Sequence, residues 1–166
     1  IPVDRKTLDL SDIKSCRDFV FKTRPDWIIN CGAYTDVEGA EINEKLAMGV
    51  NATAPRIFSE VIKEIGGRLL QISTDFVFDG NKRNTPYLTS DKRCPIGIYA
   101  ISKAKGEEAV EKILGKCGRG LILRTSWLIG PIGKNFVLTM LKLHSQGKEI
   151  NVVSDQIGVP TSSIGL

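Results

Sequence analysis

The sequence predicts an α/β fold built on a doubly wound parallel sheet. One observation is the spacing of apolar residues, in which short apolar runs typical of buried strands alternate with longer segments of helical periodicity. A second is continuity, because no repeat, low-complexity stretch or linker interrupts this alternation. Sustained strand–helix alternation is typical of βαβ units joined by right-handed crossovers.

Size and composition suit a soluble globular protein. The chain has 166 residues, enough for one domain with a core, and is 42% hydrophobic and 25% charged. The net charge of +4 comes from scattered Lys and Arg, which indicates a solvated surface and not a nucleic-acid groove. Four cysteines without a C-x-x-C pair and a single histidine, His144, argue against a metal site and suit a reducing compartment. No apolar run could span a bilayer and no signal peptide is visible, so we expect a cytoplasmic protein.

The first elements follow from capping and proline signals. Residues 1–4 are interpreted as the tail of a strand. A helix is predicted with Ser11 as its N-cap, and it ends near Thr23 because Pro25 disfavours helical geometry in the residue before it. Residues 26–30 are predicted to be a buried strand.

The small residues at 31–35 come directly after that strand. They would let a ligand approach the backbone closely, and an ordinary tight turn explains them equally well. A long helix is then predicted from Asn43 to Ile65, kinked at Pro55 and closed by Gly66.

The strand predicted at residues 68–73 ends in polar side chains. Ser73, Thr74 and Asp75 lie where ligands bind in open α/β sheets, beyond the carboxyl ends of strands. Their hydroxyls and carboxylate are candidates for catalysis, although the same residues also cap turns. A long polar loop follows.

Tyr99 and Lys103 begin the next predicted helix, residues 97–114. Four residues is about one helical turn, so both side chains share a face. A nearby cation favours the phenolate, which makes such a pair a tuned acid/base couple, but two common residues at this spacing often only share a solvated face.

The remaining elements continue the alternation. We predict a strand at 121–124, a helix at 135–145, a strand at 150–153 and a terminal loop at 155–161. Trp127 follows the first of these strands, so three candidate sites fall at or after successive strand ends.

The combined motifs resemble the dTDP-4-dehydrorhamnose reductases, a family of extended short-chain dehydrogenases/reductases. The resemblance covers essentially the whole chain and is carried by Asn30-x-x-Ala33-Tyr34-Thr35, Ser73-Thr74-Asp75-Phe76-Val77-Phe78-Asp79-Gly80, Tyr99-x-x-x-Lys103, Arg124-Thr125-Ser126-Trp127, Asn135-Phe136 and Asp155-Gln156-x-Gly158-x-Pro160-Thr161. It implies that residues 1–166 form an NAD(P)-binding, Rossmann-like domain. In that family a first strand and a Gly-rich loop precede the position matched by residue 1, and a substrate-binding part follows. We therefore expect a fragment truncated at the first strand and lacking both ends, inactive by itself.

The resemblance also implies a reaction and its residues. NADPH or NADH would reduce the C4 ketone of dTDP-4-dehydro-L-rhamnose to give dTDP-L-rhamnose. Tyr99 would donate the proton, Lys103 would lower the pKa of Tyr99 and hold the nicotinamide ribose, and Thr74 would hydrogen-bond the reacting oxygen or the phenol. The substrate-binding positions are Thr74, Asp75 and Trp127. The cofactor-binding positions are Asp4, Asp9, Leu10, Gly32, Ala33, Tyr34, Thr35, Tyr99 and Lys103.

Several of these residues have a second interpretation. Trp127 is large and apolar and could belong to a core, and Asp9 could only assist a helix N-terminus. Asp4 suits the free 2′-hydroxyl of NADH, whereas Arg5 suits the 2′-phosphate of NADPH, which leaves the cofactor open.

Other functions remain as alternatives. A related epimerase or dehydratase would share the fold, but dehydratases of this superfamily carry a Glu where this chain has Phe76. A non-catalytic, reductase-like regulatory subunit is a third alternative, although Thr74, Tyr99 and Lys103 are all present. The expected partners are a nucleotide-sugar substrate and, as an assembly, a homodimer, with no nucleic acid and no membrane.

Overall fold

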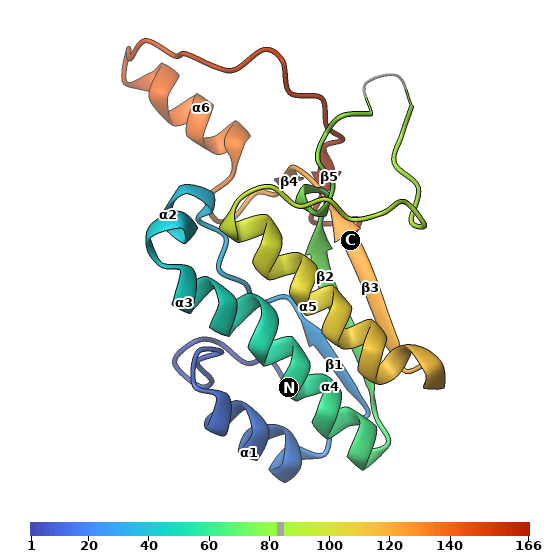
Figure 1. Cartoon of the computed structure of the whole chain (residues 1–166). Coiled ribbons are helices and arrows are strands. Elements are labelled where there is room, and N and C mark those ends of the chain that lie inside the picture. Colours follow the sequence, from blue (N-terminus) through green and yellow to red (C-terminus); the bar gives the residue numbers. More distant parts are fainter. Residues whose placement is uncertain (83–84) are drawn as a thin grey trace. The chain divides into compact units, whose positions relative to one another are not determined.

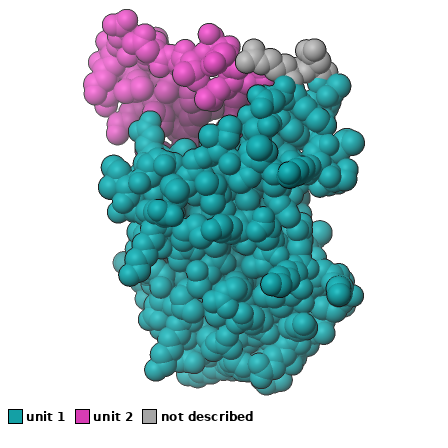
Figure 2. Space-filling view, viewed as in Figure 1, with its two compact units in different colours: residues 1–124 teal, residues 125–166 magenta. Residues whose placement is uncertain are grey.

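The computed structural model describes residues 1–82 and 85–166. It divides into two compact units, residues 1–124 (unit 1) and residues 125–166 (unit 2), which are coloured separately in Figure 2. Each unit is described by itself. Among the described residues, no helix combines the length and apolar content that crossing a membrane requires.

A parallel sheet is the centre of unit 1. Its strands are β1 (Trp27–Asn30), β2 (Arg68–Thr74) and β3 (Gly120–Thr125), in the order β1-β2-β3. β1 and β2 are parallel, with Asn30 facing Gln71, and β3 runs in the same direction (Figure 1). The predicted parallel α/β fold is confirmed. The β2 strand is one residue longer than predicted, so Thr74 ends it.

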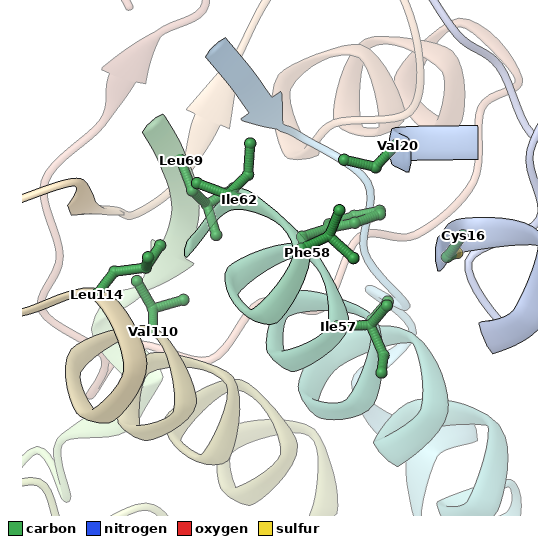
Figure 3. Packing of buried hydrophobic residues seen from close by; sticks show 10 residues of the cluster. Cys16, Val20, Ile57, Phe58, Ile62, Leu69, Val110 and Leu114 are labelled. Carbon is green, nitrogen blue, oxygen red and sulfur yellow. The ribbon is translucent and has the colours of Figure 1, made fainter. Parts of the chain in front are cut away.

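Three helices bury the apolar side of this sheet. They are α1 (Ile13–Thr23), α4 (Ala54–Ile65) and α5 (Ile98–Leu114). Their side chains interlock with Leu69 of β2 in one core, seen from close by in Figure 3. The core residues are Cys16, Val20, Ala54, Ile57, Phe58, Val61, Ile62, Leu69, Val110 and Leu114. This packing fixes α5, and with it Tyr99 and Lys103, against the sheet.

The predicted burial of β1 is wrong for half of its residues. Trp27 is 51% exposed and Ile29 63% exposed, whereas Ile28 packs against the core. Successive strand side chains point to opposite faces, and the helices of the core pack against only one of these faces. The other face of β1 is therefore left open in the described structure.

The N-cap of α1 is Asp12 and not Ser11. The Asp12 carboxylate accepts a hydrogen bond from the backbone N–H of Ser15 at 3.0 Å, as an N-cap does. Ser11 instead donates to the Asp9 carboxylate. The helix ends at Thr23 as predicted, and Arg24 follows in the left-handed region at φ 44°.

The long helix predicted from Asn43 to Ile65 is a run of three pieces. After α2 (Val37–Ile42), which was not predicted, come α3 (Glu44–Met48), a π-helical turn (Gly49–Thr53) and α4. The irregular turn lies just before Pro55, which has no N–H to donate. Gly66 ends α4 with φ 96°, as predicted.

Unit 2 differs from prediction at its second strand. Helix α6 (Phe136–Ser145) has Asn135 as its N-cap, which confirms the helix predicted there. Residues 150–153 are not a strand, because they have no strand to pair with among the described residues. The pairing in this unit is between β4 (Leu128–Ile129) and β5 (Thr161–Ser162), which are parallel. Residues 1–4 in unit 1 are not a strand either.

Candidate active site

Thr74 and Tyr99 meet where β2 ends and α5 begins. The Thr74 hydroxyl lies close enough to the Tyr99 phenol to lower the pKa of that phenol. The Thr74 hydroxyl also accepts the backbone N–H of Phe76 and donates to the Asp75 carboxylate, each at 3.2 Å. The Phe76 ring stands edge-on to the Tyr99 ring, with 5.8 Å between their centroids. Two hydroxyls and a carboxylate therefore gather at the strand end that the sequence indicated.

The start of α5 is fixed by a glycine and an acidic side chain. Gly97 has φ 81°, which L-residues with a side chain rarely adopt, and a Cβ there would lie 2.9 Å from Glu41 Oε1. The same carboxylate accepts the first N–H of the helix, that of Ile98, at 2.7 Å. This contact satisfies one of the unpaired donors of a helix N-terminus and places Tyr99 at the strand end.

Lys103 lies one turn further along α5 and is buried. Its ammonium donates to the backbone carbonyl of Ile72 in β2 at 2.7 Å. Burial lowers the pKa of Lys103 to about 8, and the negative charge of Glu107 offsets part of that effect.

The expected effect of Lys103 on Tyr99 requires a correction. From the sequence, we expected the Lys103 cation to lower the pKa of Tyr99. The pKa of Tyr99 is instead raised, first by burial and then by the nearby charge of Asp75, against a lowering by the hydrogen bond from Thr74. Burial likewise raises the pKa of Asp75. In this structure the phenol is therefore protonated at neutral pH and is a weaker acid than an ordinary tyrosine.

A second feature of unit 1 lies beside the carboxyl end of β1. A cavity of about 650 Å³ opens there, with both apolar and acidic walls. Most of the residues predicted to bind the cofactor line it, namely Asp4, Asp9, Leu10, Gly32, Ala33 and Tyr34. Among the described residues that form its wall, Thr35, Thr74, Tyr99 and Lys103 are not included.

The backbone at Gly32 approaches a cavity wall closely. A Cβ on Gly32 would lie 2.6 Å from Cδ1 of Leu10, so a side chain there would displace Leu10. The glycine therefore lets the backbone pack closely against Leu10. The two carboxylates of the cavity are engaged locally, because Asp4 accepts from Thr7 and Asp9 accepts from Ser11. These hydrogen bonds lower the pKa of both carboxyl groups and hold them ionised.

Asn51 connects the two features and was missed by the sequence reasoning. Its buried side chain accepts the N–H of Tyr34 at 2.9 Å, and its amide donates to the Tyr34 carbonyl and to the Ser102 hydroxyl, both at 3.0 Å. Ser102 in turn donates to the carbonyl of Tyr99 at 2.7 Å. A polar residue inside an apolar helical run was the available signal, and its position in a π-helical turn is typical of functional sites.

Trp127 belongs to unit 2. Its backbone is in the left-handed region at φ 45°. Its indole ring lies against Gly158, where an added Cβ would be 2.5 Å from the ring atom Cε2. The structure thus brings Thr74, Asp75 and Tyr99 together, with Lys103 on the same helix, while Trp127 is held in a separate unit by its own contacts. In the described part of the chain, no group of three or more His, Cys, Asp or Glu side chains could hold a metal ion.

Comparisons with known proteins agree on one family. The model of the RmlD substrate binding domain matches residues 1–166. A dTDP-4-dehydrorhamnose reductase of Burkholderia thailandensis is 38% identical over 161 residues, which is 97% of this chain and 53% of that protein. A dTDP-4-keto-6-deoxy-D-glucose reductase of Streptomyces niveus is 39% identical over 166 residues, or 100% of this chain and 57% of that protein.

A solved structure has the same fold at higher identity. The crystal structure of dTDP-4-dehydrorhamnose reductase from Bacillus anthracis, in complex with NADP, matches with a TM-score of 0.88 and 41% identity. The match covers 98% of this chain and 56% of that one. The chain thus spans about half the length of the relatives that it matches.

Proposed function

From the premise that this chain belongs to the RmlD substrate binding domain family, we propose that the protein containing it is an NAD(P)H-dependent reductase of nucleotide sugars. The proposed reaction is the reduction of dTDP-4-dehydro-L-rhamnose at its C4 ketone to give dTDP-L-rhamnose. The observation that carries the proposal is that the Thr74 hydroxyl and the Tyr99 phenol lie together at the end of β2, one helical turn from the buried ammonium of Lys103.

The residues of the site supply proton transfer and orientation. The Tyr99 phenol donates its proton to the carbonyl oxygen as that oxygen gains negative charge, and the phenol is replenished from solvent. Thr74 hydrogen-bonds the same oxygen or the phenol and so stabilises the charge that develops in the transition state. Lys103 holds its ammonium beside the end of β2, where it binds the nicotinamide ribose and favours the phenolate left after proton transfer.

The cavity beside β1 fits the nucleotide end of a dinucleotide cofactor. Its acidic side chains, Asp4 and Asp9, are ionised acceptors suited to ribose hydroxyls, and Leu10 offers apolar surface to a base. When bound, the reduced nicotinamide supplies the hydride that reaches the C4 carbon. Asp75 and Trp127 are proposed to contact the sugar nucleotide, and Thr35 to contribute to the cofactor turn.

Two alternatives differ in their chemistry. The relative from Streptomyces niveus is named for a different keto sugar, so another nucleotide-sugar reductase or an epimerase is the second candidate. Dehydration is disfavoured because Phe76, which packs on Tyr99, leaves no second acid/base side chain at that position. A non-catalytic regulatory subunit would not need Thr74, Tyr99 and Lys103 in one arrangement.

The test uses the full-length protein that contains residues 1–166. Purified protein is mixed with NADPH or NADH and dTDP-4-dehydro-L-rhamnose, and cofactor oxidation is followed by absorbance. NMR of the product separates reduction at C4 from epimerisation. Cofactor oxidation that depends on the keto sugar and yields dTDP-L-rhamnose is expected. Absence of any turnover, together with stoichiometric association with an unrelated enzyme in its native source, would instead support the regulatory alternative.

A further inference from the structure

Glu107 is a buried charge that the proposed chemistry does not use. It lies on α5 one turn after Lys103, and its side chain has no solvent exposure. Arg124 donates two hydrogen bonds to its carboxylate, from Nε to Oε1 at 2.9 Å and from Nη2 to Oε2 at 2.6 Å. Arg93 adds a third from Nη1 to Oε2 at 2.8 Å, and the Ser73 hydroxyl lies beside the same carboxylate and helps to lower its pKa. Both carboxylate oxygens are therefore engaged.

The partners of Glu107 come from different elements of unit 1. Ser73 precedes Thr74 at the end of β2, Arg124 is at the end of β3, and Arg93 belongs to the segment before α5. The carboxylate thus joins two strand ends to the helix that carries Tyr99. Burial would raise the pKa of Glu107, but the hydrogen bonds from Arg124, Ser73 and Arg93 outweigh burial and hold the group ionised.

We propose that Glu107 is a positioning residue for the candidate active site: by binding Arg124 and Arg93 beside Ser73 it holds the strand ends against α5 and thereby keeps Thr74 next to Tyr99. This inference rests on the proposed function for its effect on catalysis, whereas its effect on the Thr74–Tyr99 contact does not depend on that function.

A contribution to stability does not by itself explain why Glu107 is buried and paired with two arginines. A buried ion pair can often be replaced by packed apolar residues without loss of stability, because desolvation offsets the attraction between its charges. A bidentate arginine and carboxylate, in contrast, fix direction as well as distance. The geometry that these contacts fix lies within one residue of Thr74. Displacements of about 1 Å at a reacting group can change rates about 100-fold, so a geometric role is sufficient.

Glu111 provides a matched control on the same helix. It also pairs with Arg93, at 2.6 and 2.9 Å, but its side chain is 49% exposed. In the described part of the chain, its carboxylate is hydrogen-bonded to Arg93 and not to Arg124 or Ser73. Like Glu107→Gln, the Glu111→Gln substitution removes one negative charge from α5 and one ion pair with Arg93. Unlike Glu107→Gln, it leaves the contacts between Glu107 and the strand ends intact.

The experiment compares Glu107→Gln, Ser73→Ala and Glu111→Gln in the full-length protein. The spectroscopic readout is the ¹³Cζ NMR signal of Tyr99, which is assigned by its absence from the spectrum of Tyr99→Phe. We expect this signal to shift in Glu107→Gln and Ser73→Ala and to stay in place in Glu111→Gln. The kinetic readout is kcat for the keto sugar, which should fall about 10- to 100-fold in Glu107→Gln, with KM changed far less.

The NMR and kinetic readouts test the role of Glu107 and the proposed reductase function separately. If the wild-type protein does not reduce the keto sugar, the proposed function fails, and the Tyr99 signal still decides the role of Glu107. If Glu107→Gln does not fold, Ser73→Ala carries the test, because it removes one hydroxyl from a site that keeps both arginine contacts. An unshifted Tyr99 signal in folded Glu107→Gln or Ser73→Ala, or equal losses of kcat in Glu107→Gln and Glu111→Gln, would overturn the inference.

Discussion

The hydroxyl of Thr74 lies beside the phenol of Tyr99, although one residue ends a strand and the other lies in the first turn of a helix. The contact depends on a buried frame, in which α5 packs against α4 and Lys103 donates to the carbonyl of Ile72. Because the phenol is shielded from water, its pKa is raised and its proton is retained.

Replacement of Tyr99 by Phe removes the proposed proton donor and little else. General acid catalysis contributes about 10²- to 10⁴-fold, so we expect kcat to fall by that order in the full-length protein. The fold should persist, because the Phe ring can keep its edge-on contact with Phe76. Steady-state oxidation of NADPH and the circular dichroism spectrum are the measurements.

The matched control is Tyr87→Phe. Tyr87 donates to the Asp79 carboxylate at 2.6 Å and stacks on Phe78, away from Thr74. This variant should retain nearly all activity. Full activity in Tyr99→Phe would remove the proposed mechanism.

Thr74→Val tests the second hydroxyl of the site. Valine keeps the shape of threonine but cannot hydrogen-bond Tyr99 or the developing oxyanion. Loss of one such donor commonly costs about 10²- to 10³-fold in kcat, and we expect a decrease of this order. Thr74→Ser retains the hydroxyl and should recover most of the rate. Similar kcat values in the Val and Ser variants would show that the hydroxyl is not used.

The pH dependence of stability tests the burial of Lys103. The pKa of Lys103 is about 8 in the folded protein against an ordinary value of 10.5, so between these values the unfolded chain binds the extra proton. The free energy of unfolding should therefore rise with pH, by on the order of 1 kcal/mol per unit above pH 8. Chemical denaturation at pH 7.5 and pH 9 measures it.

Two lysine-to-methionine substitutions show whether this pH dependence of stability comes from Lys103. Lys103→Met should lose the rise, whereas Lys105→Met, at an exposed position of the same helix, should keep it. The upper limit of pH 9 avoids the Cys16 thiol, whose pKa is raised by burial to about 11 and which would lower stability at higher pH. Equal pH dependence in wild type and Lys103→Met would contradict the burial.

The cofactor preference provides a prediction about Arg5. Its guanidinium is largely exposed at the rim of the cavity and pairs with Asp9 at 3.4 Å. A phosphate on the ribose would attract it, and charge-assisted contacts of this kind are strong. If the protein uses NADPH, Arg5→Ala should raise KM for NADPH about tenfold and leave KM for NADH nearly unchanged. Parallel changes for both cofactors would show that Arg5 does not read the 2′-phosphate.

Local sequence signals were sufficient to predict the two elements that carry Thr74, Tyr99 and Lys103. The helix of Tyr99 and Lys103 and the strand ending in Thr74 have strong periodicity and clear boundaries, so both were predicted almost to the residue. The error at Ser11 is a local one, since Asp12 is an equally good cap and the two residues are adjacent. The error at residues 150–153 has another cause, because an apolar run becomes a strand only when a partner strand is available.

Long-range contacts account for what the sequence did not predict. The link between Asn51 and Tyr34, and that between Glu107 and Arg124, join residues far apart in the chain, and no periodicity marks them. The raised pKa of Tyr99 was missed for a related reason. Spacing along a helix indicates that two side chains share a face, but it does not show that Lys103 donates to the carbonyl of Ile72.

The contact between α5 and the π-helical turn leads to a last prediction, on Gly106. A Cβ at this position would lie 2.2 Å from the backbone carbonyl oxygen of Asn51, which cannot move without disturbing the hydrogen bonds to Tyr34 and Ser102. Alanine is favoured over glycine in a helix by about 1 kcal/mol, but overpacking against backbone costs about 1–3 kcal/mol or more. We therefore expect Gly106→Ala to lower the free energy of unfolding.

Gly115→Ala, at the residue that follows the end of the same helix, is the opposite case. Gly115 has φ −58°, and a Cβ there would meet no atom within 4 Å. Replacing glycine at such a position restricts the unfolded chain and should stabilise the protein by about 0.4–1 kcal/mol. Urea denaturation of both variants measures the two changes. The opposite signs follow only if the backbone of Asn51 lies against α5, so a stabilising Gly106→Ala would mean that the π-helical turn, and the Tyr34 turn bound to it, are not held at this helix.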